Sequence, residues 1–403
     1  MLSVEEARAR ILTHARLTEP EQVPLTKAAG RVPVLWSVTA EVDVPPFANS
    51  SMDGFALRAA DVPGELPLAG EVAAGATSLQ PLKPVTAVRI MTGAPLPAGA
   101  DAVIPVEAAE MVGEERVRLP ATQPGAYVRL VAHDTRRGDQ VELPQEALSS
   151  ASIAVLASLG IGRVSVRRFP VVAILSTGDE LVEPGEPLRA GQIHDANSLS
   201  LAAAVREAGA EPLVLPRVRD EPAAIEAALA DGVTRSDVLV VSGGVSVGRY
   251  DHVRSAIERL GKLAFWRIAV QPGKPLAFGS IGERPIVGLP GNPVSALVTF
   301  ELFVRPFIRS MLGLVGDGRL HVRATPEARI EKDPARRAFL RVSVWHEDGE
   351  IHARAAGGQG SSQLRPLADA NGLLVVPEGE AAAEPTMSYE AIMFEPLLLH
   401  SYR

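Results

Sequence analysis

The stretch Val238-Leu239-Val240-Val241-Ser242-Gly243-Gly244 decides the fold of this chain, because an uninterrupted apolar run ends abruptly in serine and glycine. A short run without polar side chains predicts a strand that is buried on both faces. Similar runs occur at Val171–Leu175 and Ile286–Leu289. Strands of this kind are typical of parallel sheets, whose two faces are covered by helices.

Helical patterns alternate with these strands between Pro170 and Gly313, which is the order expected for a parallel sheet. The predicted elements after Val171–Leu175 are, in order, a helix capped by Asn197 or Ser198, a strand at Leu213–Leu215, a helix that starts after Asp220, the strand at Val238–Val241, a helix at Val253–Leu260, a strand at Leu263–Val270, the strand at Ile286–Leu289 and a long apolar helix that begins at Pro293.

The chain on either side of this region has a different texture. Residues 50–137 contain many Gly, Pro and Asp breaks and predict a small β-rich unit. An N-terminal helix with a capping box at Ser3 and Glu6 is expected to pack with a second helix at Glu146–Leu159, as one discontinuous domain. After Gly318 the helical period disappears, and Asp348-Gly349 and Asn371-Gly372 predict the hairpin turns of a small β-barrel or sandwich.

The composition of the 403 residues excludes several classes of protein. A net charge of −8 argues against a nucleic-acid binder, and the absence of cysteine excludes disulfides, cysteine-ligated metals and thiolate nucleophiles. The motifs of P-loop, serine-hydrolase and dinucleotide-binding proteins are absent, and the histidines show no metal-ligand spacing. No apolar stretch is long enough for a membrane span, and the acidic N-terminal helix is unlike a signal peptide. We expect a soluble, cytoplasmic protein that binds neither nucleic acid nor membranes.

Three glycine-containing loops follow predicted strands, at the edge where parallel sheets bind ligands. They are Ser242–Gly248, Gly288–Ser295 and Gln271–Pro275, and the last carries Lys274, one of only 5 lysines in the chain. Glycine lets backbone N–H groups approach an anion, and serine adds hydroxyl donors. One such loop alone is typical of a plain turn, but three in one sheet predict a pocket for a phosphate or another oxyanion.

Four acids accompany these loops, namely Asp179, Glu180, Asp220 and Asp251. Carboxylates beside a phosphate site repel the ligand unless a cation bridges them, and Mg²⁺ is the usual solution. Asp220 has a structural alternative, since it precedes a helix and could serve as its cap. His252 is better explained as a residue at the start of a helix than as a base.

Six motifs occur in order along the chain: Asn49–Ala56, Met91–Pro95, Ser176–Leu181, Ser242–Gly248, Pro272–Pro275 and Gly288–Ser295. With them the chain resembles, over essentially its full length, the molybdopterin molybdenumtransferases (molybdenum insertases), which are related to the C-terminal domain of gephyrin. The resemblance implies a multidomain α/β plus β fold: a linker domain (1–49 and 138–168), an inserted β-rich domain (50–137), a molybdopterin-binding parallel-sheet α/β domain (169–316) and a C-terminal β-barrel (317–403).

The resemblance also implies a reaction. Molybdenum from molybdate enters adenylylated molybdopterin, and Mg²⁺-dependent cleavage of the adenylate releases AMP to give molybdenum cofactor. It implies an elongated homodimer whose clefts combine the α/β domain of one subunit with N-terminal parts of the other. The molybdopterin adenylyltransferase is a candidate protein partner. The absence of cysteine agrees with this reaction, because the sulfur ligands belong to the pterin.

Residue roles follow by matching the family motifs. The implied catalytic residues are Asp53, Thr92, Glu180, Asp220 and Asp251, of which Asp220 and Asp251 are the implied Mg²⁺ ligands. The implied substrate-binding residues are Thr177, Gly178, Asp179, Ser242, Gly243, Gly244, Ser246, Lys274, Pro275, Pro290, Gly291, Asn292, Pro293, Ser295, Arg341, Ser361 and Ser362; within this set Lys274, Ser295, Arg341 and a serine of the pair Ser361-Ser362 match a molybdate-binding group.

The sequence departs from the family pattern at two positions. Gln271 stands where many members carry lysine, which removes one cation near Lys274, and Arg249 stands where members often have an acid. Two other functions stay open: the adenylylation of molybdopterin, as in shorter single-domain relatives, and a non-catalytic pterin carrier or scaffold. The choice between molybdate and tungstate also stays open, since the two oxyanions share charge and nearly share size.

Overall fold

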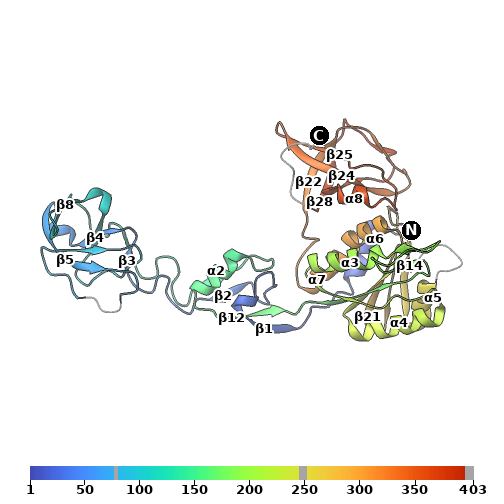
Figure 1. The fold of residues 1–403 in the computed structure, drawn as a ribbon, viewed down its shortest axis with the longest axis horizontal. Coiled ribbons are helices and arrows are strands. Elements are labelled where there is room, and N and C mark those ends of the chain that lie inside the picture. The colour runs from blue at the N-terminus through green and yellow to red at the C-terminus, as the bar shows by residue number, and fades with distance from the viewer. Residues whose placement is uncertain (77–79, 245–251, 395–403) are drawn as a thin grey trace. The chain divides into compact units, whose positions relative to one another are not determined.

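The computed structural model describes residues 1–76, 80–244 and 252–394 of the chain (Figure 1). The chain forms two compact units: unit 1 combines Met1–Glu21 with the chain from Arg167 onward, and unit 2 is Gln22–Val166. In the described ranges, no helix is both long enough and apolar enough to cross a lipid bilayer.

A six-stranded sheet of order β16-β13-β17-β21-β20-β18 forms the centre of unit 1. Its strands are β13 (Val171–Ser176), β16 (Glu211–Val214), β17 (Val238–Ser242), β18 (Lys262–Trp266), β20 (Ala277–Ile281) and β21 (Arg284–Leu289). The first four strands in this order are parallel, as the apolar runs predict. The other two are antiparallel to their neighbours, because the short turn at Gly282-Glu283 returns the chain directly from β20 into β21.

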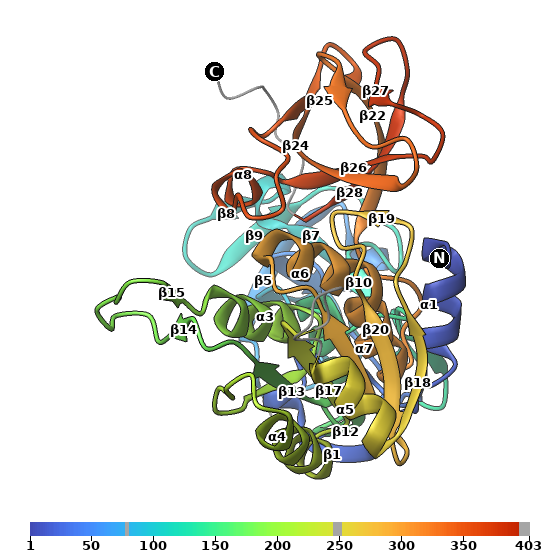
Figure 2. The same ribbon diagram turned by 90° about the vertical axis from the view of Figure 1, so that its right-hand side faces the viewer.

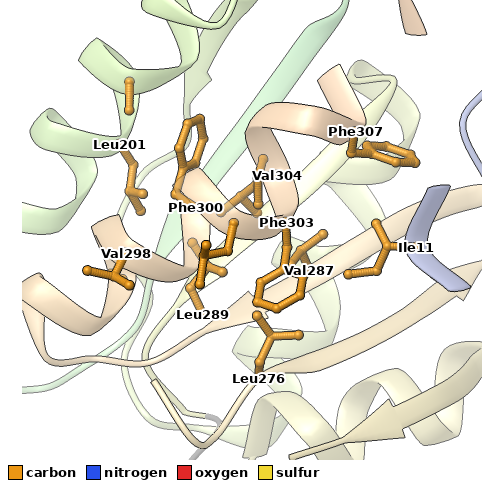
Figure 3. Packing of buried hydrophobic residues seen from close by; sticks show 14 of the residues in the cluster. Ile11, Leu201, Leu276, Val287, Leu289, Val298, Phe300, Phe303, Val304 and Phe307 are labelled. Carbon is orange, nitrogen blue, oxygen red and sulfur yellow. The ribbon is translucent and has the colours of Figure 1, made fainter. Parts of the chain in front are cut away.

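Side chains alternate between the two faces of this sheet, and each face has its own core. Val172 and Ile174 join one cluster, whereas Ala173 and Leu175 of the same strand join the other. The helices α1 (Val4–Leu12), α3 (Ala196–Glu207), α6 (Pro293–Thr299) and α7 (Arg305–Met311) pack on the first face, and α4 (Pro222–Arg235) and α5 (His252–Leu260) on the second (Figures 1 and 2). Figure 3 shows Phe300, Phe303 and Phe307 filling the first core.

The helix starts correct two predictions made from the sequence. Neither Asn197 nor Ser198 caps α3; the cap is the buried Asp195, whose carboxylate accepts the Ser198 N–H at 3.0 Å. Asp220 does not cap α4 either, because Glu221 occupies the cap position and no side chain bonds the free N–H groups there. The capping box of Ser3 and Glu6 is confirmed at α1.

The predicted strand Leu263–Val270 is interrupted in the structure. Arg267 adopts a positive φ of 80° and ends β18, and the chain then forms the short strand β19 (Val270–Gln271). β19 leaves the central sheet and pairs with β24 (Arg337–Glu347) of the next domain. This short strand therefore connects the α/β domain to the domain that follows.

The C-terminal part of unit 1 is a closed five-stranded barrel. Around it run β22 (Leu320–Pro326), β25 (Glu350–Ala355), β24, β26 (Gly372–Val376) and β28 (Tyr389–Met393), and pairing of β24 with β26 closes the ring. The barrel predicted from the family resemblance is thus present. Asp348-Gly349 forms the expected hairpin turn, but Asn371-Gly372 does not: the Asn371 side chain instead bonds both backbone groups of Val344. Shorter elements are β23 (Ile330–Glu331), β27 (Ala382–Ala383) and α8 (Arg365–Ala368).

Unit 2 is mostly strands, with a six-stranded sheet of order β7-β4-β6-β5-β9-β8. Its members are β4 (Gly54–Leu57), β5 (Gly64–Val72), β6 (Ala87–Ile90), β7 (Ala102–Pro105), β8 (Glu110–Val112) and β9 (Arg116–Leu119). The predicted helix Glu146–Leu159 is shorter in the structure, since α2 (Ser150–Ser158) begins only after the Ser149–Ser152 capping box. Further short strands are β2 (Ser37–Thr39), β3 (Asn49–Ser50), β10 (Val128–Arg129) and β11 (Gln140–Glu142).

Candidate functional site

A cavity of about 650 Å³ lies where β13, β17 and β21 end. This is the carboxyl edge of the parallel strands, where the chain leaves the sheet and backbone groups are free to meet a ligand. Predicted site residues supply much of the wall: Thr177, Glu180, Asp220, Ser242, Gly243, Gly244, Pro275, Pro290, Gly291, Asn292, Pro293 and Ser362. Residues that are far apart in the sequence therefore share one cavity because their strands are neighbours in the sheet.

Close backbone approach explains the glycines after β17. Gly243 has a φ of 95°, and a Cβ atom there would lie 2.8 Å from the Thr177 carbonyl oxygen. A Cβ on Gly244 would lie 2.5 Å from Cγ2 of Val253. The Gly243 N–H donates to the Leu289 carbonyl, and the Thr177 N–H donates to the Ser242 carbonyl. These bonds fix the floor of the cavity, and a side chain at Gly243 would force its strands apart.

The barrel also reaches the cavity. Ser362 lines it, and the hydroxyl of the neighbouring Ser361 accepts a hydrogen bond from Nδ2 of Asn292 at 2.9 Å. Asn292 precedes α6 but its side chain does not cap that helix. Its amide is therefore used to tie the loop after β21 to the barrel loop that follows β25.

The acidic wall consists of Asp220 and Glu180. Burial, and then the charges of Glu180 and Asp179, raise the pKa of Asp220 above its ordinary value. Asp179 itself points to Arg219 at 3.4 Å and does not line the cavity. The Glu180 carboxylate folds back over Gly178, where a Cβ would lie 2.7 Å from Oε2. The absence of a side chain at Gly178 therefore leaves space for this carboxylate, and Gly178 itself does not line the cavity.

These acids fit a divalent cation that shares its ligands with a substrate. A positive charge relieves a buried carboxyl such as Asp220, whose pKa is raised by burial and by neighbouring acids, and Mg²⁺ is commonly held by one or two carboxylates together with phosphate oxygens and water. In the described part of the chain no group of three or more His, Cys, Asp or Glu side chains is arranged for a metal ion. The fit is therefore to a shared cation and not to an all-protein cage. Asp251, the other predicted ligand, and Ser246 lie outside the described residues.

Three residues of the predicted molybdate group lie beside the cavity wall but not in it. Lys274 is exposed, Ser295 is buried, and Arg341 is completely buried beneath the barrel loop Gly357–Ser362. Arg341 Nη2 donates to the carbonyls of Gly358 and Gly360, whereas Nε and Nη1 have no partner among the described residues. Burial lowers the pKa of this guanidinium. A buried cation with unused donors is costly to a fold unless something else binds it.

Gln271, the departure from the family lysine, has a structural role. Its Oε1 accepts the Asp333 N–H at 3.0 Å, and its backbone pairs with β24. The side chain therefore ties the α/β domain to the barrel, which a lysine could not do because an ammonium group accepts no hydrogen bond.

Asp53 and Thr92 form a separate small arrangement in unit 2. Asp53 Oδ1 accepts the Thr92 N–H at 2.6 Å and the Thr92 hydroxyl at 2.8 Å. These two bonds lower the pKa of Asp53, so the exposed carboxylate stays ionised. Met52 and Met91, which precede Asp53 and Thr92 in the sequence, are also exposed.

Sequence reasoning missed one side of the cavity. It is made by Leu181, Ile193, His194, Asp195, Ala196 and Asn197. The first three belong to an arm formed by the parallel pair β14 (Leu181–Val182) and β15 (Ile193–His194), which projects from the α/β domain in Figure 2. The sequence predicts Asn197 only as a helix cap, and its position in the first turn of a helix, where polar groups can face a ligand, is the only local signal for this second role.

The fold and the cavity define a multidomain α/β protein whose parallel sheet carries a small-molecule site at its carboxyl edge. Three family models match consecutive parts of the chain: the MoeA N-terminal region (domain I and II) at residues 2–160, a probable molybdopterin binding domain at 173–310 and the MoeA C-terminal region (domain IV) at 307–386. The chain belongs to the molybdopterin molybdenumtransferase family, a family of transferases in molybdenum cofactor biosynthesis, which confirms the family and the enzyme class that the motifs predict.

Relatives match the whole chain. Molybdopterin molybdenumtransferase 2 of Mycobacterium tuberculosis is 40% identical, with 94% of this chain and 96% of the relative covered. Molybdopterin molybdenumtransferase of Haemophilus influenzae is 36% identical, with 97% and 98% covered. A solved molybdopterin biosynthesis MoeA protein from Pyrococcus horikoshii has a TM-score of 0.81 at 33% identity, covering 98% of this chain and 100% of that one.

Proposed function

We propose that this chain inserts molybdenum from molybdate into adenylylated molybdopterin and that Mg²⁺-dependent cleavage of the adenylate releases AMP. The observation that carries the proposal is the cavity at the carboxyl edge of the sheet, where the Ser242–Gly244 loop faces the acids Glu180 and Asp220. A phosphate-bearing substrate needs both: donors that approach closely, and carboxylates that hold a neutralising cation.

In this proposal the glycine loops bind the substrate and exclude side chains from its phosphates. The Ser242 hydroxyl and the backbone of Gly243 and Gly291 contact the anionic groups. Asp220 and Asp251 would hold Mg²⁺, with Glu180 in the same cavity wall as Asp220, and the ion would supply positive charge that neutralises the phosphates during cleavage. The raised pKa of Asp220 supports this role, because a carboxylate that is destabilised by burial and by the nearby charges of Glu180 and Asp179 is stabilised by a cation.

Molybdate, the second substrate, is assigned to the barrel side of the cavity. Lys274 and Ser295 approach from the α/β domain, and Arg341 and the pair Ser361-Ser362 from the barrel. The unused donors Nε and Nη1 of the buried Arg341 support this assignment, since an oxyanion would supply the acceptors that the guanidinium lacks.

The proposal includes a homodimer in which Asp53 and Thr92 of one copy complete the cleft of the other, as the family resemblance implies. The exposed Asp53 supports this, because hydrogen bonds from Thr92 lower its pKa and keep its carboxylate ionised where a second copy could reach it. The molybdopterin adenylyltransferase is the proposed supplier of substrate, and the cytoplasm the proposed compartment.

The test uses the purified full-length chain with adenylylated molybdopterin and Mg²⁺, with and without molybdate. AMP release and molybdenum bound to the pterin are measured. We expect molybdate-dependent AMP release together with metal incorporation. Binding without cleavage would establish a carrier, and formation of adenylate from ATP and molybdopterin would establish an adenylyltransferase; either result overturns the proposal.

A further inference from the structure

Asn197 connects three separate segments at the wall of the cavity. It is the second residue of α3, and its Nδ2 donates to the Ser242 hydroxyl at 2.7 Å and to the Gly291 carbonyl at 2.7 Å. Ser242 ends β17, and Gly291 lies in the loop after β21. One amide group thus holds the first turn of α3 against both loops that bear the glycines of the site.

The chemistry of these partners fixes the direction of each hydrogen bond. A carbonyl oxygen only accepts, so the atom that faces Gly291 must be the amide nitrogen, and the same nitrogen then meets Ser242. The Ser242 hydroxyl is therefore an acceptor toward Asn197. Its own proton finds no acceptor in the described part of the chain, and Ser242 lines the cavity. The hydroxyl is left as a donor for a ligand.

The unpartnered amide oxygen of Asn197 shows that stability alone does not explain an asparagine at this position. Asn197 Oδ1 is buried and accepts no hydrogen bond from any described residue. A buried acceptor without a partner destabilises a fold, so asparagine is an expensive choice for a structural tie. Ser176 Oγ and Thr177 Oγ1, on the neighbouring strand end, are buried and unpartnered in the same way.

We propose that Asn197 is a positioning residue of this site: it orients the Ser242 hydroxyl as a hydrogen-bond donor toward a phosphate group of the bound pterin. It acts through Ser242 and through the loop at Gly291. The inference rests on the proposed function, because it assigns the ligand of the cavity as a phosphorylated pterin. It names a role for a residue that the family motifs of the sequence did not single out.

A double-mutant cycle tests the coupling between the two side chains. The dissociation constant of metal-free molybdopterin is measured anaerobically for the wild-type chain, Asn197→Ala, Ser242→Ala and the double variant. Each single change should weaken binding about ten-fold, the loss of one oriented hydrogen bond to a charged group. The double variant should bind no more weakly than Asn197→Ala alone, because the Ser242 donor is already misoriented when the Asn197 amide is absent. Losses that multiply to about a hundred-fold overturn the inference.

Asn197→Asp gives a second readout that a structural role would not produce. An ionised carboxylate cannot donate to Ser242, and it turns the hydroxyl proton toward itself and away from the cavity. Binding should therefore be weak at neutral pH and recover as the introduced carboxyl is protonated on acidification, relative to the wild-type profile. An Asn197→Asp profile parallel to that of the wild type overturns the inference.

Asn371→Ala is the matched control for the loss of a buried asparagine. Asn371 bonds both backbone groups of Val344 in the barrel, so its loss should lower the unfolding temperature and leave the dissociation constant unchanged. Failure of the wild-type chain to bind molybdopterin overturns the proposed function and this inference together. Binding by the wild type with independent single losses overturns this inference alone.

Discussion

Gly243→Ala tests whether the cavity depends on a close approach of two strand ends. Gly243 has a φ of 95°, a conformation that costs an L-residue about 1–2 kcal/mol. A Cβ would also lie 2.8 Å from the Thr177 carbonyl oxygen and 3.1 Å from its hydroxyl. Relieving such an overlap within packed backbone adds about 1–3 kcal/mol. The free energy of unfolding of unit 1 should therefore fall by about 2–5 kcal/mol in total.

Gly282→Ala provides the control for this prediction. Gly282 has a φ of 58°, but nothing lies within 4 Å of the position its Cβ would take. Its substitution should cost only the conformational part, about 1–2 kcal/mol. Urea unfolding of both variants measures the difference, and titration with molybdopterin should show weaker binding for Gly243→Ala alone. Equal destabilisation with unchanged binding would refute the view that this contact shapes the site.

Three further predictions concern charged groups. Asp220→Asn should reduce Mg²⁺-dependent AMP release about 100-fold, because it removes a charged cation ligand, whereas Asp231→Asn on the exposed surface of α4 should not. Arg341→Met should leave the unfolding temperature unchanged or raise it, since it removes a buried and incompletely paired cation, while the molybdate dependence of AMP release weakens. Burial lowers the pKa of His321, but Glu390 and Asp317 raise it more, so its pKa is raised in the folded state. The charged ring therefore stabilises the fold below the unfolded pKa of about 6.5, and this stabilisation is lost as pH rises through the raised folded value. His321→Gln should flatten the dependence of urea unfolding on pH above neutral pH.

The parallel core of the fold could be predicted because its signals are local. The run Val238–Val241 has no polar residue, and the structure buries it completely as β17. The break at Arg267 could not be predicted, because beyond it the chain leaves the central sheet and pairs with β24 of the barrel, far along the sequence. The Arg267 N–H donates to the Leu276 carbonyl, and its guanidinium stacks on Trp266 with 3.8 Å to the ring centroid. These two contacts are local, but the pairing of Val270 with Arg337 lies outside any window of neighbouring residues.

In the candidate site, too, some residues could be predicted from local sequence and others could not. Gly243 and Asp220 follow recognisable strands or precede a helix, so their spacing in the sequence brings them to one edge of the sheet. The burial of Arg341 beneath the barrel loop depends on how that loop folds over β24, and the spacing of residues in the sequence does not predict this burial. The use of Asn197 depends on the positions of Ser242 and Gly291, which come from two other strands.

Unpartnered polar groups and displaced pKa values occur together at this site for one physical reason. The oxygens Ser176 Oγ, Thr177 Oγ1 and Asn197 Oδ1 are buried without partners in the described chain, and each such group costs about 1–3 kcal/mol. Asp220 adds a carboxyl whose pKa is raised by burial and by the charges of Glu180 and Asp179, which together outweigh the opposite effect of His252. A ligand that supplies the missing donors and charge recovers part of this cost on binding. The folded state should therefore gain stability with ligand concentration, by about 2.7 kcal/mol at a hundred times the dissociation constant. The instability of these groups within the chain is thus a source of affinity for the substrate.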